Sequence, residues 1–303
     1  MTSARRLLVT GAHGFVAGSV IRQADETWEV HALSRGEALE KRGRSHWHSF
    51  DPCDAERLTQ LFREVRPDAV IHTAALADID FCEANQALAN HLNVGLTQTL
   101  ADLCAASGAK LVFCSTDTVF DGEHAPYRED DPPGPVNFYA HTKVAAERSV
   151  AGSGAPSVIA RLSLVVGLPV LGAGNSFLTK MLASLRAGRE VGVPAHEVRT
   201  PIDVITLGRA LLELAQGDHA GVFHLGGNDR LNRLDMARHI ATRFGFSPDL
   251  IVANDPTKIP GRAPRPRDAS LDNAKAQGAL KTPMRSFDDG LSLILQTAQS
   301  HPR

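Results

Sequence analysis

Apolar and polar positions follow two alternating patterns through the first half of the chain. Short, continuous apolar runs are separated by longer segments in which apolar residues recur every three or four positions. The runs predict buried strands, and the longer segments predict helices with one apolar face. Strands that are buried on both faces and separated by helices are typical of a doubly wound parallel sheet, so we expect an α/β fold. The predicted strands cover residues 7–9, 30–33, 69–71, 111–114 and 158–162, and the predicted helices cover residues 16–23, 54–66, 88–107 and 139–150.

The alternation becomes less regular after residue 167. A Pro- and Arg-rich stretch at 256–267 predicts a binding loop or a segment that crosses between parts of the fold. We expect residues 168–303 to form mainly a smaller C-terminal lobe, with residues 199–227 returning to the sheet of residues 1–167. In this half, helices are predicted at 175–186, at 207–215 and after Asn232, and a strand at 222–225.

Composition and charge narrow the function classes. The 303 residues carry 32 Lys and Arg against 34 Asp and Glu, a formal net charge of −2. This balance argues against a dedicated nucleic-acid binder, because such proteins present a basic face. No run approaches the ~18 apolar residues of a membrane span. The four cysteines lie far apart, without the ligand spacing of a zinc site, so we expect reduced cysteines, a cytoplasmic protein and no metal.

A glycine-containing turn follows the first predicted strand. Residues 10–17 read TGAHGFVA. Gly11 permits a tight turn, Gly14 lets the backbone approach a pyrophosphate, and the helix N-terminus beyond them attracts the anion. We therefore expect dinucleotide binding at this turn. The predicted contacts are those of Gly11, His13, Gly14, Phe15 and Val16.

The end of the second predicted strand selects between the two nicotinamide cofactors. An acidic residue there would bind the ribose 2′-hydroxyl of NAD, whereas an arginine accommodates the 2′-phosphate of NADP. The chain has Ser34 and Arg35 at this point and no acid before Glu37. We therefore expect NADP(H), with His13 as a second donor; the alternative is that Arg35 is a solvated surface residue.

A tyrosine and a lysine stand four residues apart on a predicted helix. Tyr139 and Lys143 share one helix face, and a nearby ammonium favours the phenolate, which would bring the phenol pKa of about 10 closer to neutrality. The preceding strand ends at Ser115, Thr116 and Asp117, and ligands of doubly wound sheets bind beyond the carboxyl ends of the strands. We therefore expect Thr116 to hydrogen-bond a substrate oxygen beside Tyr139.

These motifs resemble those of the extended short-chain dehydrogenases/reductases, and within them the dTDP-4-dehydrorhamnose reductase-like, sugar-nucleotide-binding group. The resemblance covers almost the whole chain. It implies a Rossmann-type fold and the reduction of a keto-sugar by NADPH. The motifs are TGAHGF at 10–15, FDPCD at 50–54, VIHTAALADIDFCE at 70–83, STDTVFDG at 115–122, NFYAHTK at 137–143, RLSLVVG at 161–167, NSF at 175–177, VRTPIDV at 198–204 and RPRDASLDNAK at 265–275.

The resemblance also implies roles for individual residues. Tyr139 would give a proton to the carbonyl oxygen with Thr116 beside it, and Lys143 would hold the nicotinamide ribose and tune Tyr139. Asn93 would lie beneath them within a proton relay. The further cofactor contacts that it implies are those of Asp51 and Pro52 at the adenine and of Thr73, Ala74 and Ala75 along the cofactor backbone. The expected substrate contacts are those of Asp117, Leu164, Asn175, Arg199 and Arg265.

Departures from the group leave the substrate open. An aromatic residue often stands where this chain has Leu164, and the tyrosine two positions later is Val166. The sequence therefore does not specify dehydrorhamnose. We expect a sugar-like small-molecule keto substrate, nucleotide-activated or free, or a related secondary metabolite. We expect no nucleic-acid or membrane partner, and a homodimer stays open.

Two other functions remain as alternatives. One is a non-catalytic NADP-binding regulatory subunit similar to that of methionine adenosyltransferase, and the other is a sugar-nucleotide epimerase or dehydratase. The complete set of Thr116, Tyr139 and Lys143 argues against a purely regulatory role. Arg35 argues against an epimerase, because such enzymes more typically prefer NAD.

Overall fold

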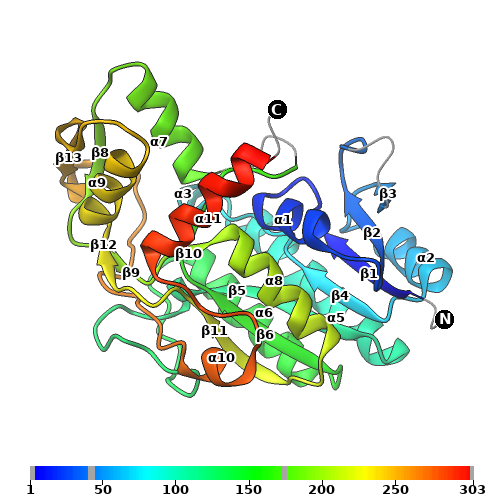
Figure 1. Ribbon diagram of the computed structural model, residues 1–303. Helices are drawn as coiled ribbons and strands as arrows, with labels where there is room; N and C mark the ends of the chain where they lie inside the picture. Colours follow the sequence, from blue (N-terminus) through cyan, green and yellow to red (C-terminus); the bar gives the residue numbers. More distant parts are fainter. Residues whose placement is uncertain (1–3, 40–44, 172–175, 301–303) are drawn as a thin grey trace.

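The centre of the molecule is a parallel β-sheet (Figure 1). A computed structural model describes residues 4–39, 45–171 and 176–300. Within these residues seven parallel strands pair in the order β11-β6-β5-β4-β1-β2-β3. The chain starts in the middle of the sheet and winds outward to both edges, which confirms the predicted Rossmann-type, doubly wound α/β fold. The strands are β1 (Arg5–Thr10), β2 (Trp28–Ser34), β3 (Ser45–Ser49), β4 (Ala69–His72), β5 (Lys110–Thr116), β6 (Ser157–Leu162) and β11 (Gly221–Leu225).

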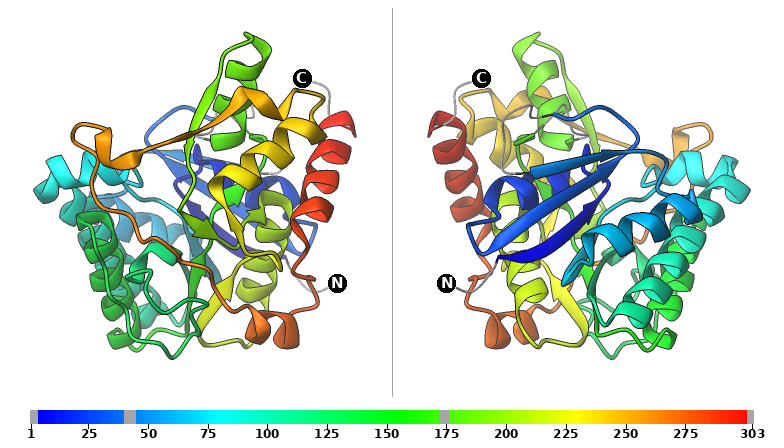
Figure 2. Two further views of the ribbon diagram at one scale, coloured as in Figure 1. Left: turned by 90° about the vertical axis from the view of Figure 1, so that its left-hand side faces the viewer. Right: turned by 90° about the vertical axis from the view of Figure 1, so that its right-hand side faces the viewer.

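Helices cover both faces of this sheet, as the two side views in Figure 2 show. Leu7 and Val9 of β1 pack with one set of helices, and Leu8 packs with the other, because successive strand residues point to opposite faces. All three side chains are fully buried, and each contributes about 1.5–3 kcal/mol of burial free energy. The first layer contains α1 (Phe15–Gln23) and α8 (Val204–Gln216), and the second contains α2 (Ala55–Val65), α5 (Leu96–Ser107) and α6 (Phe138–Gly152).

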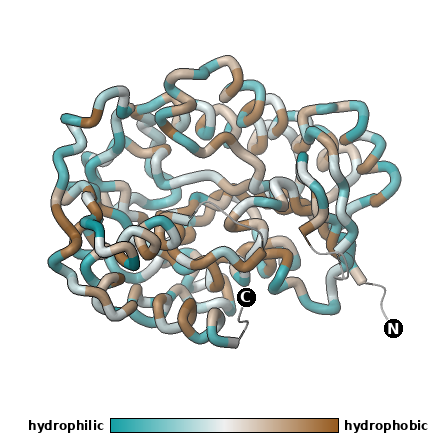
Figure 3. Tube along the Cα trace, turned by 90° about the horizontal axis from the view of Figure 1, so that it is seen from above, coloured by the Kyte–Doolittle hydropathy of each residue, from teal (hydrophilic) through white to brown (hydrophobic). Residues whose placement is uncertain are grey.

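A third apolar cluster lies outside the sheet. It joins α7, α9 and α11 to the short parallel strand pair β8 and β13, which stands with α7 and α9 at the upper left of Figure 1. In Figure 3, hydrophobic segments run through the middle of the molecule and many hydrophilic segments lie along its outline. The division into two domains at residue 167 stays a prediction. The elements of this part are β7 (Val165–Val166), α7 (Phe177–Arg186), β8 (Val191–Pro194), β9 (Val198–Arg199), β10 (Ile202–Asp203), β12 (Leu231–Asn232), α9 (Arg233–Arg243), β13 (Ile251–Asn254), α10 (Ala274–Ala279) and α11 (Phe287–Ser300).

The predicted helix at 88–107 is interrupted in the structure. A short helix α4 (Gln86–Asn90) passes into a π-helical turn at His91–Gly95 and only then into α5. A π turn adds a residue to the helical repeat and rotates what precedes it, so Leu88 is 45% exposed while Leu96 and Leu100 are buried. The expectation of one continuous apolar face was therefore wrong at its N-terminal end.

The edge strand β3 was not predicted. Its sequence, SHWHS, has polar residues at four of five positions, so it lacks the apolar run that marks the other strands. It pairs with β2 over its whole length. None of the helices in the described ranges combines the length and apolar character that crossing a bilayer requires.

Candidate active site

The glycine turn between β1 and α1 is shaped for a phosphate. Gly11 has φ of +71°, and a Cβ there would lie 2.8 Å from the Cα of Ala74, so only glycine fits. Gly14 is the N-cap of α1, with no side-chain cap and no acidic residue in the first turn. The first backbone N–H groups of a helix lack intrahelical partners and attract anions. The turn therefore fits the pyrophosphate of a dinucleotide, with Phe15 and Val16 at the first helical positions.

The segment after β4 lies against this turn. The Thr73 hydroxyl donates to the Thr10 carbonyl at 2.8 Å, and the Ala74 N–H lies 3.4 Å from the Thr10 hydroxyl. Ala75, the next residue, is exposed. The structure thus brings Thr73 and Ala74 to the glycine turn, and the contact of these residues and of Ala75 with a cofactor stays a prediction.

Two further residues of the predicted cofactor site, Arg35 and His13, lie near the carboxyl end of β2, and we call them the cofactor corner. Arg35 is exposed after the buried Ser34, and among the described residues it has no ion-pair partner. The His13 ring lies beside the next residue, since a Cβ on Gly36 would be 3.0 Å from its Cε1. The His13 ring therefore lies next to the residue that follows Arg35, and the binding of one anionic group by both side chains stays a prediction.

Asp51 and Pro52 follow β3 at the same end of the sheet. Asp51 is exposed and its carboxylate accepts from the Cys53 N–H at 3.0 Å, whereas Pro52 is buried. Their predicted contact with the adenine stays a prediction.

Thr116 and Tyr139 meet at the carboxyl end of β5. The Thr116 hydroxyl, at the last residue of the strand, lies 3.3 Å from Asp117 Oδ1, and Thr116 and Tyr139 line the same cavity. Tyr139 stands in the first turn of α6, which Asn137 caps by accepting from the Ala140 N–H at 2.9 Å. The helix start therefore fixes the phenol next to the strand end. We call Thr116 and Tyr139 the hydroxyl wall.

The pKa of the Tyr139 phenol is shifted in the direction opposite to the expected one. Burial raises it, and the negative charge of Asp117 raises it further, while the Thr116 hydroxyl opposes the shift. The expectation of a lowered phenol pKa was therefore wrong, because desolvation outweighs the effect of Thr116. The phenol is protonated at neutral pH.

Lys143 lies one helical turn beyond Tyr139 and is 2% exposed. Its ammonium donates to the Cys114 carbonyl at 2.6 Å and lies 4.1 Å from the centre of the Phe113 ring. Burial lowers its pKa to about 8, with Cys114 and Glu147 acting in the other direction. No hydrogen bond between described atoms joins Lys143 to Tyr139.

Asn93 stands in the π-helical turn and is 1% exposed. Its amide oxygen accepts from the Leu76 N–H at 2.8 Å, and its amide nitrogen donates to the Leu76 carbonyl at 3.1 Å and the Thr142 hydroxyl at 3.0 Å. These bonds tie the segment after β4 to α6. Its place in a proton relay stays a prediction.

A cavity of about 480 Å³ opens in front of the hydroxyl wall. Four arginines also line it, and we call them the arginine wall. Leu164 lines it as well, whereas Asn175, a predicted substrate contact, lies outside the described residues. The arginine wall consists of Arg199, Arg233, Arg262 and Arg265.

Three members of the arginine wall have carboxylate partners. Arg199 lies 3.4 Å from Asp117 Oδ2, Arg265 lies 2.5 Å from Asp80 Oδ1, and Arg262 pairs with Glu197. Burial raises the pKa of Asp117, and the charge of Arg199 opposes that shift. The predicted substrate residues Asp117, Arg199 and Arg265 thus all face one cavity.

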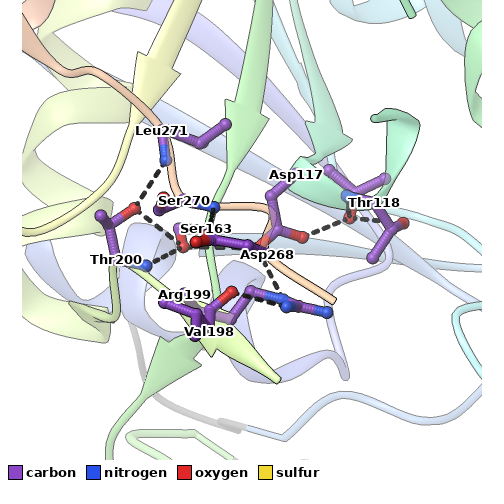
Figure 4. Close-up of polar contacts among 10 residues, drawn as sticks. Asp117, Thr118, Ser163, Val198, Arg199, Thr200, Asp268, Ser270 and Leu271 are labelled. Carbon is purple, nitrogen blue, oxygen red and sulfur yellow. Dashed lines mark hydrogen bonds and ion pairs between the residues drawn. The ribbon is translucent and has the colours of Figure 1, made fainter. Parts of the chain in front are cut away.

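Figure 4 shows how the Asp117 carboxylate is anchored from the side of β9. Ser163 donates to Asp117 Oδ2 at 3.3 Å, Thr200 donates to Ser163 at 3.3 Å, and the Leu271 N–H donates to Thr200 at 3.2 Å. These bonds join four segments that are distant in sequence. It holds the Asp117–Arg199 pair in place.

Arg233, at the start of α9, is the arginine that sequence reasoning missed. Its Nε is buried and has no hydrogen-bond partner among the described residues, and its guanidinium lies 4.6 Å from the centre of the Phe177 ring. Burial lowers its pKa to about 10. A buried donor without a partner is costly, so this guanidinium is prepared for an anion. No motif around position 233 signals the role.

Glu147 lies next to the site, in contact with Ser115 and Arg161, and the sequence analysis did not identify it. Ser115 donates to Glu147 at 2.5 Å, and Arg161 donates to its second carboxylate oxygen at 2.8 Å. Both members of this ion pair are buried. The pair ties α6 to β5 and β6 next to Thr116.

Comparison with known proteins gives consistent matches over nearly the whole chain. The family model described as RmlD substrate binding domain matches residues 5–300. Methionine adenosyltransferase 2 subunit beta of Rattus norvegicus is 30% identical over 280 residues, covering 90% of this chain and 82% of that protein. The dTDP-4-dehydrorhamnose reductase of Mycobacterium tuberculosis (strain ATCC 25618 / H37Rv) is 30% identical over 296 residues, covering 96% and 92%. The crystal structure of dTDP-4-dehydrorhamnose reductase from Bacillus anthracis str. Ames in complex with NADP has the same fold, with a TM-score of 0.85, 23% identity and coverage of 97% and 99%.

Proposed function

Because the chain belongs to the RmlD substrate binding domain family, we propose that it is an NADPH-dependent ketoreductase of a keto-sugar carried on a nucleoside diphosphate. Family membership confirms the resemblance read from the sequence. Relatives in this family include dTDP-4-dehydrorhamnose reductases, which are NADPH-dependent oxidoreductases. The observation that carries the proposal is one cavity lined both by the hydroxyls of Thr116 and Tyr139 and by four arginines.

The hydroxyl wall provides the proton chemistry in this proposal. Tyr139 donates its proton to the carbonyl oxygen, and Thr116 donates a hydrogen bond to the same oxygen. The raised pKa keeps the phenol protonated at neutral pH, which is the state that a reduction requires. NADPH, when bound, would supply the hydride to the carbonyl carbon. General acid catalysis of this kind contributes ~10²–10⁴-fold in rate.

The glycine turn and the corner beyond β2 fit NADPH. The backbone donors at the start of α1 would bind the pyrophosphate, and Arg35 with His13 would bind the 2′-phosphate. Lys143 would hold the nicotinamide ribose and keep a positive charge near Tyr139. With a pKa of about 8, most of its population is charged at pH 7.

The arginine wall favours a diphosphate over a neutral sugar. Four guanidiniums share three carboxylates, and Arg233 forms no ion pair within the described ranges, although the charges of Glu197 and Asp117 act on it. A buried positive charge in excess of its partners favours an anionic ligand, and guanidinium geometry suits phosphate oxygens. A nucleoside diphosphate would neutralise this excess while its sugar reaches Tyr139.

The regulatory alternative is kept because relatives named methionine adenosyltransferase 2 subunit beta match at 30% identity. In that case the glycine turn and the residues after β2 would hold NADP(H) without turnover. The protonated Tyr139 and its place with Thr116 in one cavity favour the reductase, since binding alone requires neither.

A substrate panel tests the proposal. Purified protein with NADPH is offered nucleoside-diphosphate keto-sugars and the corresponding free keto-sugars, and NADPH oxidation is followed by absorbance. We expect oxidation with a nucleotide-linked member and much slower oxidation with its free sugar. Tight NADPH binding without oxidation by any member would support the regulatory alternative instead.

A further inference from the structure

Three histidines and a glutamate gather on the two edge strands of the sheet, away from the cavity. Glu29 and His31 alternate on β2, and His46 and His48 alternate on β3. Residues two apart on a strand point to the same face, and the register places His31 opposite His46. All four side chains therefore share one face of the sheet edge, next to α2, whose Glu64 lies near His48.

The spacing of three donor atoms matches a metal coordination shell. Glu29 Oε1 lies 3.2 Å from His46 Nε2 and 3.5 Å from His31 Nε2, and one donor atom from each residue lies within 4.8 Å of the others. Ligands bound to Zn²⁺ at about 2.0–2.2 Å with tetrahedral angles are separated by about 3.3 Å. The side chains are already near this distance without an ion.

The buried nitrogen of His31 is a second, independent sign. The side chain is 10% exposed, and among the described residues its Nε2 has no hydrogen-bond partner. Its Nδ1 lies 3.0 Å from His48 Nε2. When Nδ1 donates to His48, Nε2 keeps a lone pair that can bind an ion lying between it and the Glu29 carboxylate, and a ligand histidine is commonly oriented through its other nitrogen in this way.

We propose that Glu29, His31 and His46 bind one divalent transition-metal ion such as Zn²⁺, with His48 orienting His31. Two imidazoles and a carboxylate are borderline ligands that suit Zn²⁺ and related ions, and three ligands leave a position for water. His46 and Glu29 are 59% and 43% exposed, so the ion has an entry path. The His31 and His46 rings stack at 21°, and the exposed His46 has room to turn its nitrogen onto the ion.

The site departs from the expectation of no metal, which rested on cysteine count and on ligand spacing along the chain. Its donors come from two strands, 15 residues apart at His31 and His46, and no cysteine takes part. Such an ion would hold the polar strand β3 against β2. Asp51 follows the end of β3, and Arg35 follows the end of β2. The proposal does not rest on the proposed reductase function.

Calorimetric titration of EDTA-treated, dialysed protein with Zn²⁺ tests the site directly. We expect one ion per chain, a loss of affinity of more than about 100-fold in His46→Ala, and a loss of about 10- to 100-fold in His48→Ala, which removes only the orienting partner. His124→Ala is the matched control, because His124 is 80% exposed and pairs with Asp121. We expect its affinity to equal that of the unsubstituted protein.

Thermal melting shows whether a variant loses Zn²⁺ affinity because its fold is damaged. Zn²⁺ should raise the melting temperature of the unsubstituted protein and of His124→Ala, but not that of His46→Ala or Glu29→Gln, whose metal-free melting curves should match the parent. Equal Zn²⁺ affinity in all variants would mean adventitious binding by surface histidines and would overturn the proposal. The absence of saturable 1:1 binding by the unsubstituted protein would overturn it as well.

Discussion

The two walls of the cavity differ in how they are built and in what they hold. The hydroxyl wall comes from the end of β5 and the first turn of α6, two adjacent rigid elements. The arginine wall comes from β9, the start of α9 and the loop at 262–265, which are far apart in sequence. One wall presents hydroxyls with their protons retained, and the other presents guanidiniums in excess of their carboxylate partners.

This difference suits two tasks, proton delivery and diphosphate recognition, which require different precision in the placement of side chains. Proton delivery requires a donor within hydrogen-bond reach of one oxygen, and regular elements hold Thr116 and Tyr139 in that way. Recognition of a diphosphate depends on the sum of several charges, which loops and helix ends can supply from many directions. Substitutions in the two walls should therefore have separable effects on rate and on substrate affinity.

Replacing Tyr139 by Phe should have the largest effect. The ring and its packing remain, but the transferable proton is lost, so kcat should fall by ~10²–10⁴-fold with NADPH affinity unchanged. Steady-state kinetics and a fluorescence titration of NADPH measure the two quantities.

The other tyrosine of the chain provides a matched control. The Tyr127 hydroxyl accepts from the Gly122, Glu123 and His124 N–H groups, so it organises a loop. Tyr127→Phe should lower the melting temperature and leave kcat nearly unchanged. Equal kcat in Tyr139→Phe and the parent would remove the hydroxyl wall from the mechanism.

Replacing Arg233 by Leu should act on affinity alone. Charge-assisted hydrogen bonds contribute about 1.5–3 kcal/mol, so KM for a nucleotide-linked substrate should rise about 10- to 150-fold while kcat changes little. Arg243→Leu, on the exposed side of α9 next to Asp288, is the control. A matching loss with the free sugar would show that Arg233 does not bind the diphosphate.

Replacing Arg35 by Asp tests the cofactor corner, which lies outside both walls. Because Arg35 is exposed, solvent weakens its interaction, and we expect about a tenfold loss in NADPH affinity with NADH affinity retained or improved. Competitive titration of both cofactors measures the preference. An unchanged ratio would assign the 2′-phosphate to another group.

The pH dependence of kcat/KM should show the charge of Lys143 behind the hydroxyl wall. Its pKa is lowered to about 8 from 10.5, so the ammonium is lost as pH rises through about 8, and the rate should fall from there by up to about tenfold per pH unit. Between pH 8 and 10.5 the unfolded chain binds more protons at this group, so its contribution to stability rises over that range. A fall in kcat/KM above pH 8 while the protein stays folded therefore indicates Lys143. A value of kcat/KM that stays constant up to pH 9 would contradict a role for the Lys143 charge in the reaction.

The parts of the site that depend on local sequence could be predicted. Gly11 and Gly14 follow a strand and open a helix, and Tyr139 and Lys143 are related by one helical turn, so spacing alone places each pair. Arg233 could not be found in this way, because its position in the cavity depends on how α9 packs. The direction of the Tyr139 pKa shift also escaped prediction, since it depends on burial that spacing does not reveal.

The same limit explains what was missed in the fold. The strand β3 carries polar residues on both faces, and its place follows from pairing with β2 rather than from its own pattern. The π-helical turn at His91–Gly95 changes the helix phase without altering the spacing of the leucines in the sequence. Long-range pairing and local helix geometry decided both cases.

The central claim is hydride transfer to a keto-sugar within this cavity. It is tested most directly by a single turnover with NADPH that carries deuterium at nicotinamide C4, followed by mass and NMR analysis of the sugar. The account predicts, with the cofactor labelled on the transferred face, deuterium on the new carbinol carbon and one NADP⁺ formed per product. Substrate converted without label, or cofactor that stays bound with its deuterium retained against every keto-sugar offered, would contradict it.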